Sequence, residues 1–222
     1  MSIKRNFIAA AAVAALCAGG AGAAELAGRA VAVQQDALQA EGAVGFPIDA
    51  GAEIFRNARV YTKQYGTAEI RLEDGTALTV APNASLVIDD YVFAGAGRPG
   101  SLALSLSRGA MRMVSGRMPK EGVAVSTSIG TIGVRGTDFW IEAPSDDLIR
   151  LWVLEGVVTA APANSATVFE FTAPAFATCS AGGCEPGEAP PVPVTNPLGG
   201  EAGGAGDPGI DAEESHESPS DF

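Results

Sequence analysis

Residues able to perform acid–base or nucleophilic chemistry are few and poorly placed in this chain of 222 residues. Nucleophilic catalysis by serine or cysteine generally needs a positioned base, which is usually histidine. The chain has one histidine, His216, within a Gly-, Ser- and acid-rich stretch that cannot hold it in place. Paired carboxylates lie at Glu73–Asp74, Asp89–Asp90 and Asp146–Asp147, each in a predicted turn where solvated acids are ordinary. The sequence therefore predicts no catalytic residues, and the chain is not expected to be an enzyme.

Two cysteines near the C-terminal end are the candidates for redox or metal chemistry. Cys179 and Cys184 flank a flexible Ser-Ala-Gly-Gly stretch, and an oxidising compartment would let them form a local disulfide. A metal site is the alternative, but it would need further thiolate or imidazole ligands, and His216 is far out in the sequence. We therefore predict a Cys179–Cys184 disulfide, no metal and no cofactor.

The first 23 residues have the three parts of a secretory signal. Lys4 and Arg5 form a positive n-region, residues 7–18 form a small-apolar run, and residues 21–23 give the Ala-x-Ala cleavage pattern. An uncleaved anchor is the alternative, but the run is shorter than the roughly 18 to 20 residues that span a bilayer. We expect cleavage after Ala23, no transmembrane segment in the mature chain, and a periplasmic or secreted location of the Gram-negative envelope type.

The mature chain is strongly acidic. Loss of Lys4 and Arg5 reduces the 14 basic residues to 12, against 26 acidic residues, which gives a net charge of −14. This balance argues against a nucleic-acid partner. The acids gather among Gly, Pro and Ser in residues 179–222, a composition that cannot bury enough apolar surface to offset its ordering entropy. We predict a disordered acidic tail over residues 179–222.

Residues 24–178 are predicted to form a single all-β domain, either solenoid-like or sandwich-like. Apolar and charged residues alternate strictly over residues 68–73, and alternation continues at 78–80, 86–88, 102–106, 123–125, 139–141 and 149–153. Gly-, Pro-, Asn- and Asp-rich turns separate these segments. Short strands at such regular spacing are typical of sandwiches, barrels and solenoids. Only residues 34–41 could support a helix, of barely two turns.

The turn at Asp74-Gly75 can be predicted in more detail. A two-residue hairpin would set Ile70 opposite Thr79, an inward residue against an outward one, which a sheet with one buried face forbids. A three-residue turn or a solenoid corner would instead place Ile70 opposite Val80 and Leu72 opposite Leu78. No tight Asp-Gly hairpin is therefore expected.

A second hairpin, near residues 144–147, gives a candidate binding patch. If Phe139 and Ile141 face inward, period 2 places alternate residues on the other face, and a three-residue turn at 145–147 pairs them across the strands. The candidate patch consists of these four residues: Trp140 opposite Trp152, and Glu142 opposite Arg150. The indoles are expected either beneath another segment or exposed as a partner-binding surface, since Trp and Arg dominate interface hot spots.

Three ordered motifs in the body resemble those of the FecR domain family. They are Asp74-Gly75-Thr76 after an alternating strand, Arg135-Gly136-Thr137 leading to Phe139, and Glu155-Gly156 closing a later strand. The resemblance extends from about residue 28 to 161. It implies an extracytoplasmic, solenoid-like all-β module of the kind best known in transmembrane regulators that pass an outer-membrane signal to a sigma factor.

The chain departs from that regulator architecture. From the sequence we expect no cytoplasmic anti-sigma segment ahead of the domain and no spanning helix. We therefore expect a non-enzymatic binding or signalling module whose partner is an unknown envelope protein or polymer. The alternative is a structural or matrix-associated surface scaffold.

Overall fold

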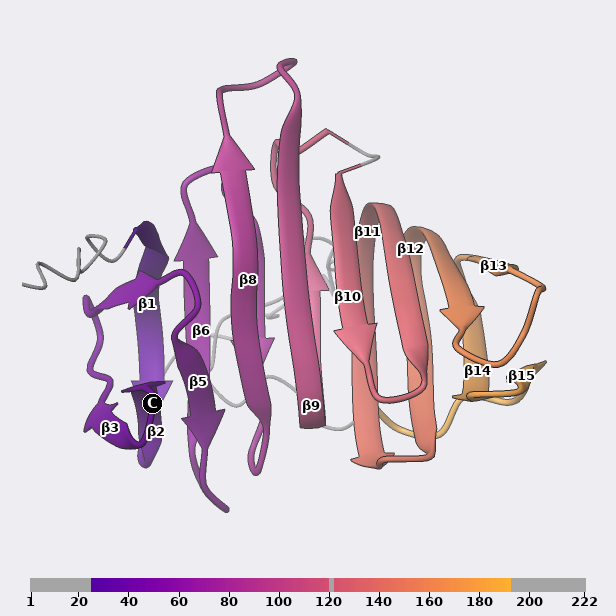
Figure 1. The fold of residues 1–222 in the computed structure, drawn as a ribbon, viewed down its shortest axis with the longest axis horizontal. Helices are drawn as coiled ribbons and strands as arrows, with labels where there is room; N and C mark the ends of the chain where they lie inside the picture. Colours follow the sequence, from indigo (N-terminus) through magenta and orange to yellow (C-terminus); the bar gives the residue numbers. More distant parts are fainter. Residues whose placement is uncertain (1–24, 120–121, 193–222) are drawn as a thin grey trace, which may run out of the picture.

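The computed structural model describes residues 25–119 and 122–192, which form an all-β fold in one continuous sheet of 15 strands (Figure 1). Within these ranges the structure has no helix, and therefore no helix that is long and apolar enough to cross a membrane. The strands are β1 (Leu26–Gln34), β2 (Ala37–Glu41), β3 (Val44–Pro47), β4 (Glu53–Phe55), β5 (Arg59–Thr62), β6 (Thr67–Leu72), β7 (Ala77–Val80), β8 (Ser85–Phe93), β9 (Gly100–Val114), β10 (Val123–Thr127), β11 (Gly130–Ser145), β12 (Leu148–Pro162), β13 (Phe169–Thr172), β14 (Ala175–Ser180) and β15 (Gly183–Pro186). The predicted all-β class is confirmed.

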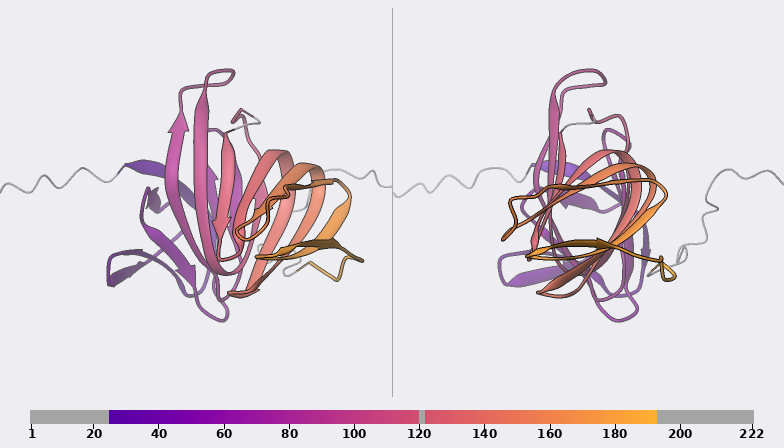
Figure 2. Two further views of the ribbon diagram at one scale, coloured as in Figure 1. Left: turned by 45° about the vertical axis from the view of Figure 1, so that its right-hand side comes forward. Right: turned by 90° about the vertical axis from the view of Figure 1, so that its right-hand side faces the viewer.

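The sheet folds over itself into two layers around one core (Figures 1 and 2). Three long strands, β9, β11 and β12, belong to both layers. The first half of β9 pairs with β8 and β10, whereas its second half pairs with β7 and with the second half of β11. Likewise, β12 pairs with β14 before residue 156 and with β13 after it. The result is sandwich-like, although both layers are hydrogen-bonded parts of one sheet.

Each long strand changes layer at a glycine with positive φ. Gly109 in β9, Gly136 in β11 and Gly156 in β12 have φ values of 77°, 59° and 79°, a region that L-residues disfavour. The backbone packs closely at two of these bends. A Cβ at Gly109 would lie 2.7 Å from Ala84 Cβ, and one at Gly156 would overlap the Gly136 carbonyl oxygen. These glycines let a strand leave one layer and continue in the other.

The core lies between the layers and follows the predicted period of two. In β9, Leu102, Leu104 and Leu106 are buried while the residues between them are half-buried. The opposing layer contributes Ile70, Leu78, Met111, Met113, Phe139, Ile141, Leu151 and Val153, all essentially inaccessible to solvent. The alternation therefore reflects one buried face on each layer.

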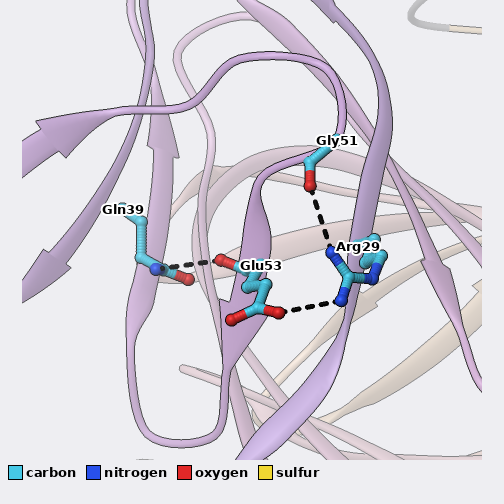
Figure 3. A network of polar contacts seen from close by, with 4 residues as sticks. All are labelled: Arg29, Gln39, Gly51 and Glu53. Atoms are coloured by element: carbon cyan, nitrogen blue, oxygen red, sulfur yellow. Dashed lines mark hydrogen bonds and ion pairs between the residues drawn. The ribbon is translucent and has the colours of Figure 1, made fainter.

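Figure 3 shows a polar network at the N-terminal end of the sandwich. Arg29 of β1 pairs with Glu53 of β4 at 2.8 Å and donates to the Gly51 carbonyl at 3.5 Å. The side-chain amide of Gln39, in β2, donates to the Glu53 carbonyl at 3.3 Å. The network links β1 and β4 to β2, which pairs with other strands. Because the Arg29–Glu53 ion pair is exposed to solvent, the network adds little to the free energy of unfolding, and its main effect is to fix the relative positions of these strands.

Two local expectations are wrong. Residues 37–41 form strand β2, which pairs with β5 and β3 and so gains a sheet partner that a two-turn helix would lack. The turn between β6 and β7 comprises residues 73–75, which places Ile70 opposite Leu78 rather than Val80. The parity argument holds, but a hydrogen bond from Leu72 N to Thr76 O closes the turn one residue earlier than expected.

The β11–β12 hairpin has the predicted pairing with a different turn. Trp140 faces Trp152 and Glu142 faces Arg150, as expected. Ser145 then pairs with Leu148, so the turn itself has two residues. A register shift between Glu142 and Ser145 leaves one extra residue in β11 as a bulge, and this residue makes up the difference from the expected turn. The predicted three-residue turn is therefore replaced by a tight turn and a bulge.

The folded region extends beyond the predicted domain boundary. Residue 178 lies within β14, and β15 pairs with it through residue 186, so the first part of the predicted tail belongs to the sheet. The cross-strand pair Cys179–Cys184 forms the predicted disulfide, with a Cα–Cα distance of 4.0 Å. The predicted signal (1–23) and the remainder of the tail (193–222) lie outside the described residues.

Candidate functional site

Asp74, a motif residue predicted to be a solvated turn acid, is fully buried. Its Oδ1 accepts hydrogen bonds from Thr76 N and from the Tyr91 hydroxyl, both at 3.2 Å. Its Oδ2 accepts from Thr76 Oγ1 at 2.6 Å and from Met118 N at 3.2 Å. Four donors therefore satisfy both carboxylate oxygens, which a buried acid requires.

The motif residues also bind an irregular segment that follows β9. Four consecutive backbone amides, those of residues 115–118, donate to Asp74, Thr76 and Thr137. Ser115 N donates to Thr137 O at 2.9 Å, Gly116 N to Thr76 Oγ1 at 3.1 Å, Arg117 N to Asp74 O at 2.9 Å, and Met118 N to Asp74 Oδ2. We call this arrangement the motif clamp. It ties two motifs that are about 60 residues apart in sequence to one connecting segment.

The second and third motifs meet at the bends of β11 and β12. Gly156 packs directly on the Gly136 carbonyl, and Thr137 is buried beside it, with its amide donating to Ser115 Oγ at 3.0 Å. Phe139 is among the largest fully buried side chains. Arg135 and Glu155 are exposed at the same corner. All motif side chains except these two therefore serve the packing of the domain.

Tyr91 completes the clamp, and its ionisation gives a testable prediction. Asp74 N donates to the Tyr91 hydroxyl at 2.9 Å, and the hydroxyl donates to Asp74 Oδ1. Burial raises the pKa of Tyr91 well above its ordinary 10.0, and the negative charge of Asp74 adds to the rise. The folded state therefore holds this proton more tightly than the unfolded state does.

The stability of the folded domain is expected to fall as pH rises above about 10, where only the unfolded state readily releases the Tyr91 proton. Each pH unit should cost up to about 1.4 kcal/mol. Urea unfolding at a series of pH values between about 9 and 11 measures this slope. Tyr91→Phe should be less stable at neutral pH but show a shallower alkaline loss. Identical slopes for the two proteins would contradict the assignment.

The candidate patch residues lie on the outer face of β11 and β12, as parity predicts, but the indoles are not exposed. Trp140 and Trp152 are each 3% exposed, and Arg150 pairs with Glu142 at 2.9 Å. Phe176 and Val192 pack against the indoles. Of the two expected alternatives, the indoles therefore lie beneath another segment, formed by Phe176 of β14 and Val192 of the predicted tail, and the exposed aromatic surface is wrong.

Three features of this region were not predicted from the sequence. Arg112 and Asp138 form a two-pronged ion pair at 2.8 and 2.6 Å on the same outer face. Tyr91 and the amides of residues 115–118 complete the clamp from distant positions. The covering segment at residues 187–192 was hidden in the Pro- and Gly-rich composition. Only the ion pair left a sequence signal, since Asp138 has outward parity just before the predicted strand at 139–141 and Arg112 lies between the apolar residues Met111 and Met113.

Other potential sites are limited. Among the described residues, no group of three or more His, Cys, Asp or Glu side chains is arranged to hold a metal ion. The edge strand β3, which pairs only with β2, carries the exposed side chains Val44 and Phe46, at 58% and 63% exposure. We call these two residues the edge patch.

The fold and the motif clamp define a two-layered, all-β module whose signature residues hold its backbone together. Residues 58–159 match the family model described as FecR protein, so the predicted resemblance to the FecR domain family is confirmed over this part of the chain. No curated protein matches the chain.

Solved structures similar to the chain include two crystal structures of a proposed anti-sigma factor from Parabacteroides distasonis, at 2.50 and 1.65 Å resolution. Each has 16% sequence identity and a TM-score of 0.47. Each alignment covers 58% of this chain and 58% of the solved chain.

Proposed function

We propose that the chain is a non-enzymatic, extracytoplasmic binding and signalling module whose partner is an envelope protein. The match of residues 58–159 to the FecR family is the observation that carries this proposal, because the resemblance implies a regulatory module with protein partners. The secretory pattern of residues 1–23 supports export. The strongly acidic composition supports a partner other than nucleic acid.

The placement of the motif residues is consistent with a binding role. The side chains of Asp74 and Thr76 and the backbone carbonyl of Thr137 accept the hydrogen bonds of the clamp, so the family signature shapes the domain and leaves recognition to its outer surface. The edge patch is the best-defined apolar feature of that surface, because β3 has one free edge among the described strands and Phe46 is 63% exposed. An edge strand with exposed apolar side chains is a template for an extended partner segment.

Photo-crosslinking in intact cells tests this function. The full chain would carry a photoreactive phenylalanine analogue at Phe46, or at the exposed Thr131 of β11 as the matched control. We expect one predominant crosslinked partner from position 46, recovered in the periplasmic fraction, and little from position 131. Phe46→Ser should abolish capture without lowering the thermal midpoint.

Fractionation separates this function from the scaffold alternative. A soluble periplasmic pool with one stoichiometric partner supports the signalling module. Recovery mainly from the matrix or medium, with no partner crosslinked above the control, would overturn the proposal in favour of a surface scaffold.

A further inference from the structure

An aromatic row crosses the outer face of the C-terminal half of the sandwich. Trp140 of β11 lies opposite Trp152 of β12, which in turn lies opposite Phe176 of β14. The rings of Trp152 and Phe176 are 5.1 Å apart and tilted by 58°. These side chains point away from the main core and form a separate cluster with Ala81 and Ala110. We call Trp140, Trp152 and Phe176 the aromatic row.

Residues 187–192 lie over this row, and we call them the strap. The strap begins where β15 ends, with Gly187 N donating to Phe176 O at 3.1 Å. The Trp152 indole N–H donates to the Pro190 carbonyl at 2.8 Å. Val192 then packs against the Trp140–Trp152 cluster. The strap therefore contacts residues of the row at three successive points, and two of these are hydrogen bonds made by the strap's backbone.

The sequence of the strap favours an extended conformation before it docks. Ala189, Pro190 and Val192 each precede a proline, which disfavours the helical region for all three. Proline also fixes its own φ near −65°, the polyproline II value. Such a segment loses little conformational entropy when it binds. An aromatic surface with an indole N–H aimed at a prolyl carbonyl is the arrangement that recognises polyproline II segments.

We propose that the aromatic row is a binding site for an extended, proline-rich peptide, occupied in this chain by its own strap. The indole of Trp152 supplies the directional hydrogen bond, and the rings of Trp140 and Phe176 supply the apolar contact. An apolar cavity of about 470 Å³ runs beside the strap, lined by Trp152, Leu154, Phe171, Pro174 and Phe176 among others, so the site extends beyond what the strap fills. This inference does not depend on the partner proposed above.

Because the strap is covalently joined to β15, a free peptide can compete with it for the aromatic row only when the strap docks less well. A short linker gives the strap an effective concentration on the order of millimolar, which free peptide cannot exceed at ordinary concentrations. The wild-type site is therefore closed to a peptide in solution, and the experiment requires a full-length chain whose strap docks less well.

Intrinsic fluorescence reports on this site alone, because Trp140 and Trp152 are the only tryptophans in the chain. The probe is a synthetic peptide with the sequence of residues 186–194, and the control peptide has its prolines 190, 191 and 193 replaced by alanine. The loosened protein is the full chain with Pro190→Gly, Pro191→Gly and Val192→Ser. Relative to wild type, its emission should shift to longer wavelength and acrylamide should quench it more strongly.

The native peptide should reverse both changes saturably in the loosened protein, and the control peptide should not. Adding Trp152→Phe keeps a ring but deletes the indole N–H, and should weaken peptide binding about fivefold, with Trp140 as reporter. Unchanged emission in a folded loosened protein would contradict the claim that the strap covers the two indoles. If the indoles become exposed but the native peptide does not reverse the change in emission and quenching, the aromatic row is not a peptide-binding site.

Wild-type protein keeps the proposal testable if the loosened protein fails to fold. The indole N–H of Trp152 should exchange slowly with deuterated solvent in the intact chain, and its resonance is assigned by its absence from Trp152→Phe. Exchange of both indole protons at the rate of free tryptophan would overturn the proposal.

Discussion

Replacing Gly156 by alanine is expected to lower the free energy of unfolding by about 4 kcal/mol. The φ of +79° costs an L-residue about 1–2 kcal/mol, and overpacking adds about 1–3 kcal/mol. The new Cβ would overlap the Gly136 carbonyl and approach Thr137 Cγ2 to 2.9 Å. Because the clashing atom belongs to the backbone at the bend of β11, the clash can be relieved only if the bends of β11 and β12 move apart. Urea unfolding of both proteins measures the difference.

Gly75→Ala is the matched control for this substitution. Gly75 has a φ of +89° but nothing within 4 Å of the position a Cβ would occupy, so only the backbone strain of about 1–2 kcal/mol applies. Equal losses for the two variants would mean that the bends of β11 and β12 do not pack as closely as described.

Asp74→Ala should destabilise the domain by about 4 kcal/mol. The substitution removes the acceptor for four hydrogen bonds and leaves the buried amide of Met118 and the Thr76 side chain without their partner. Unsatisfied buried donors cost about 1–3 kcal/mol each, partly offset where water enters. Thermal and urea unfolding of the purified domain measure the loss.

Asp146→Ala is the matched control, because both acids lie in turns but Asp146 is exposed. Its effect should stay within about 0.5 kcal/mol. Asp74→Asn separates shape from charge, since the amide has the size of the carboxylate but turns its NH2 group either toward Met118 N and Thr76 Oγ1 or toward Thr76 N and the Tyr91 hydroxyl. A loss for Asp74→Ala no larger than for Asp146→Ala would contradict the clamp.

The sequence predicted the parts of the fold that depend on alternation. Inward and outward faces of β6, β9, β11 and β12 follow from period 2 because each layer buries one side. The Trp140–Trp152 pairing followed from the same parity. The turn lengths could not be predicted as well, because a bulge can supply one residue without changing which side chains face the core.

The features that sequence analysis missed depend on contacts between distant segments. Asp74 has the sequence context of a solvated turn acid, and only the approach of Tyr91 and residues 115–118 buries it. Residues 187–192 have the composition of a disordered tail, yet Pro190 and Val192 contact the aromatic row. Composition describes what a segment can bury by itself, and it cannot show a partner surface formed elsewhere in the chain.

Backbone hydrogen exchange at residues 115–118 tests most directly the claim that the family motifs act as a structural clamp. These residues lie outside any strand, so their amides would exchange quickly if solvent were their partner. Because Thr137, Thr76 and Asp74 accept all four hydrogen bonds, we expect protection comparable to that of the core strands β9 and β11. Asp74→Ala should remove it at Met118 first. Exchange of these four amides at the rate of exposed loop residues, in a domain whose strands stay protected, would contradict the clamp.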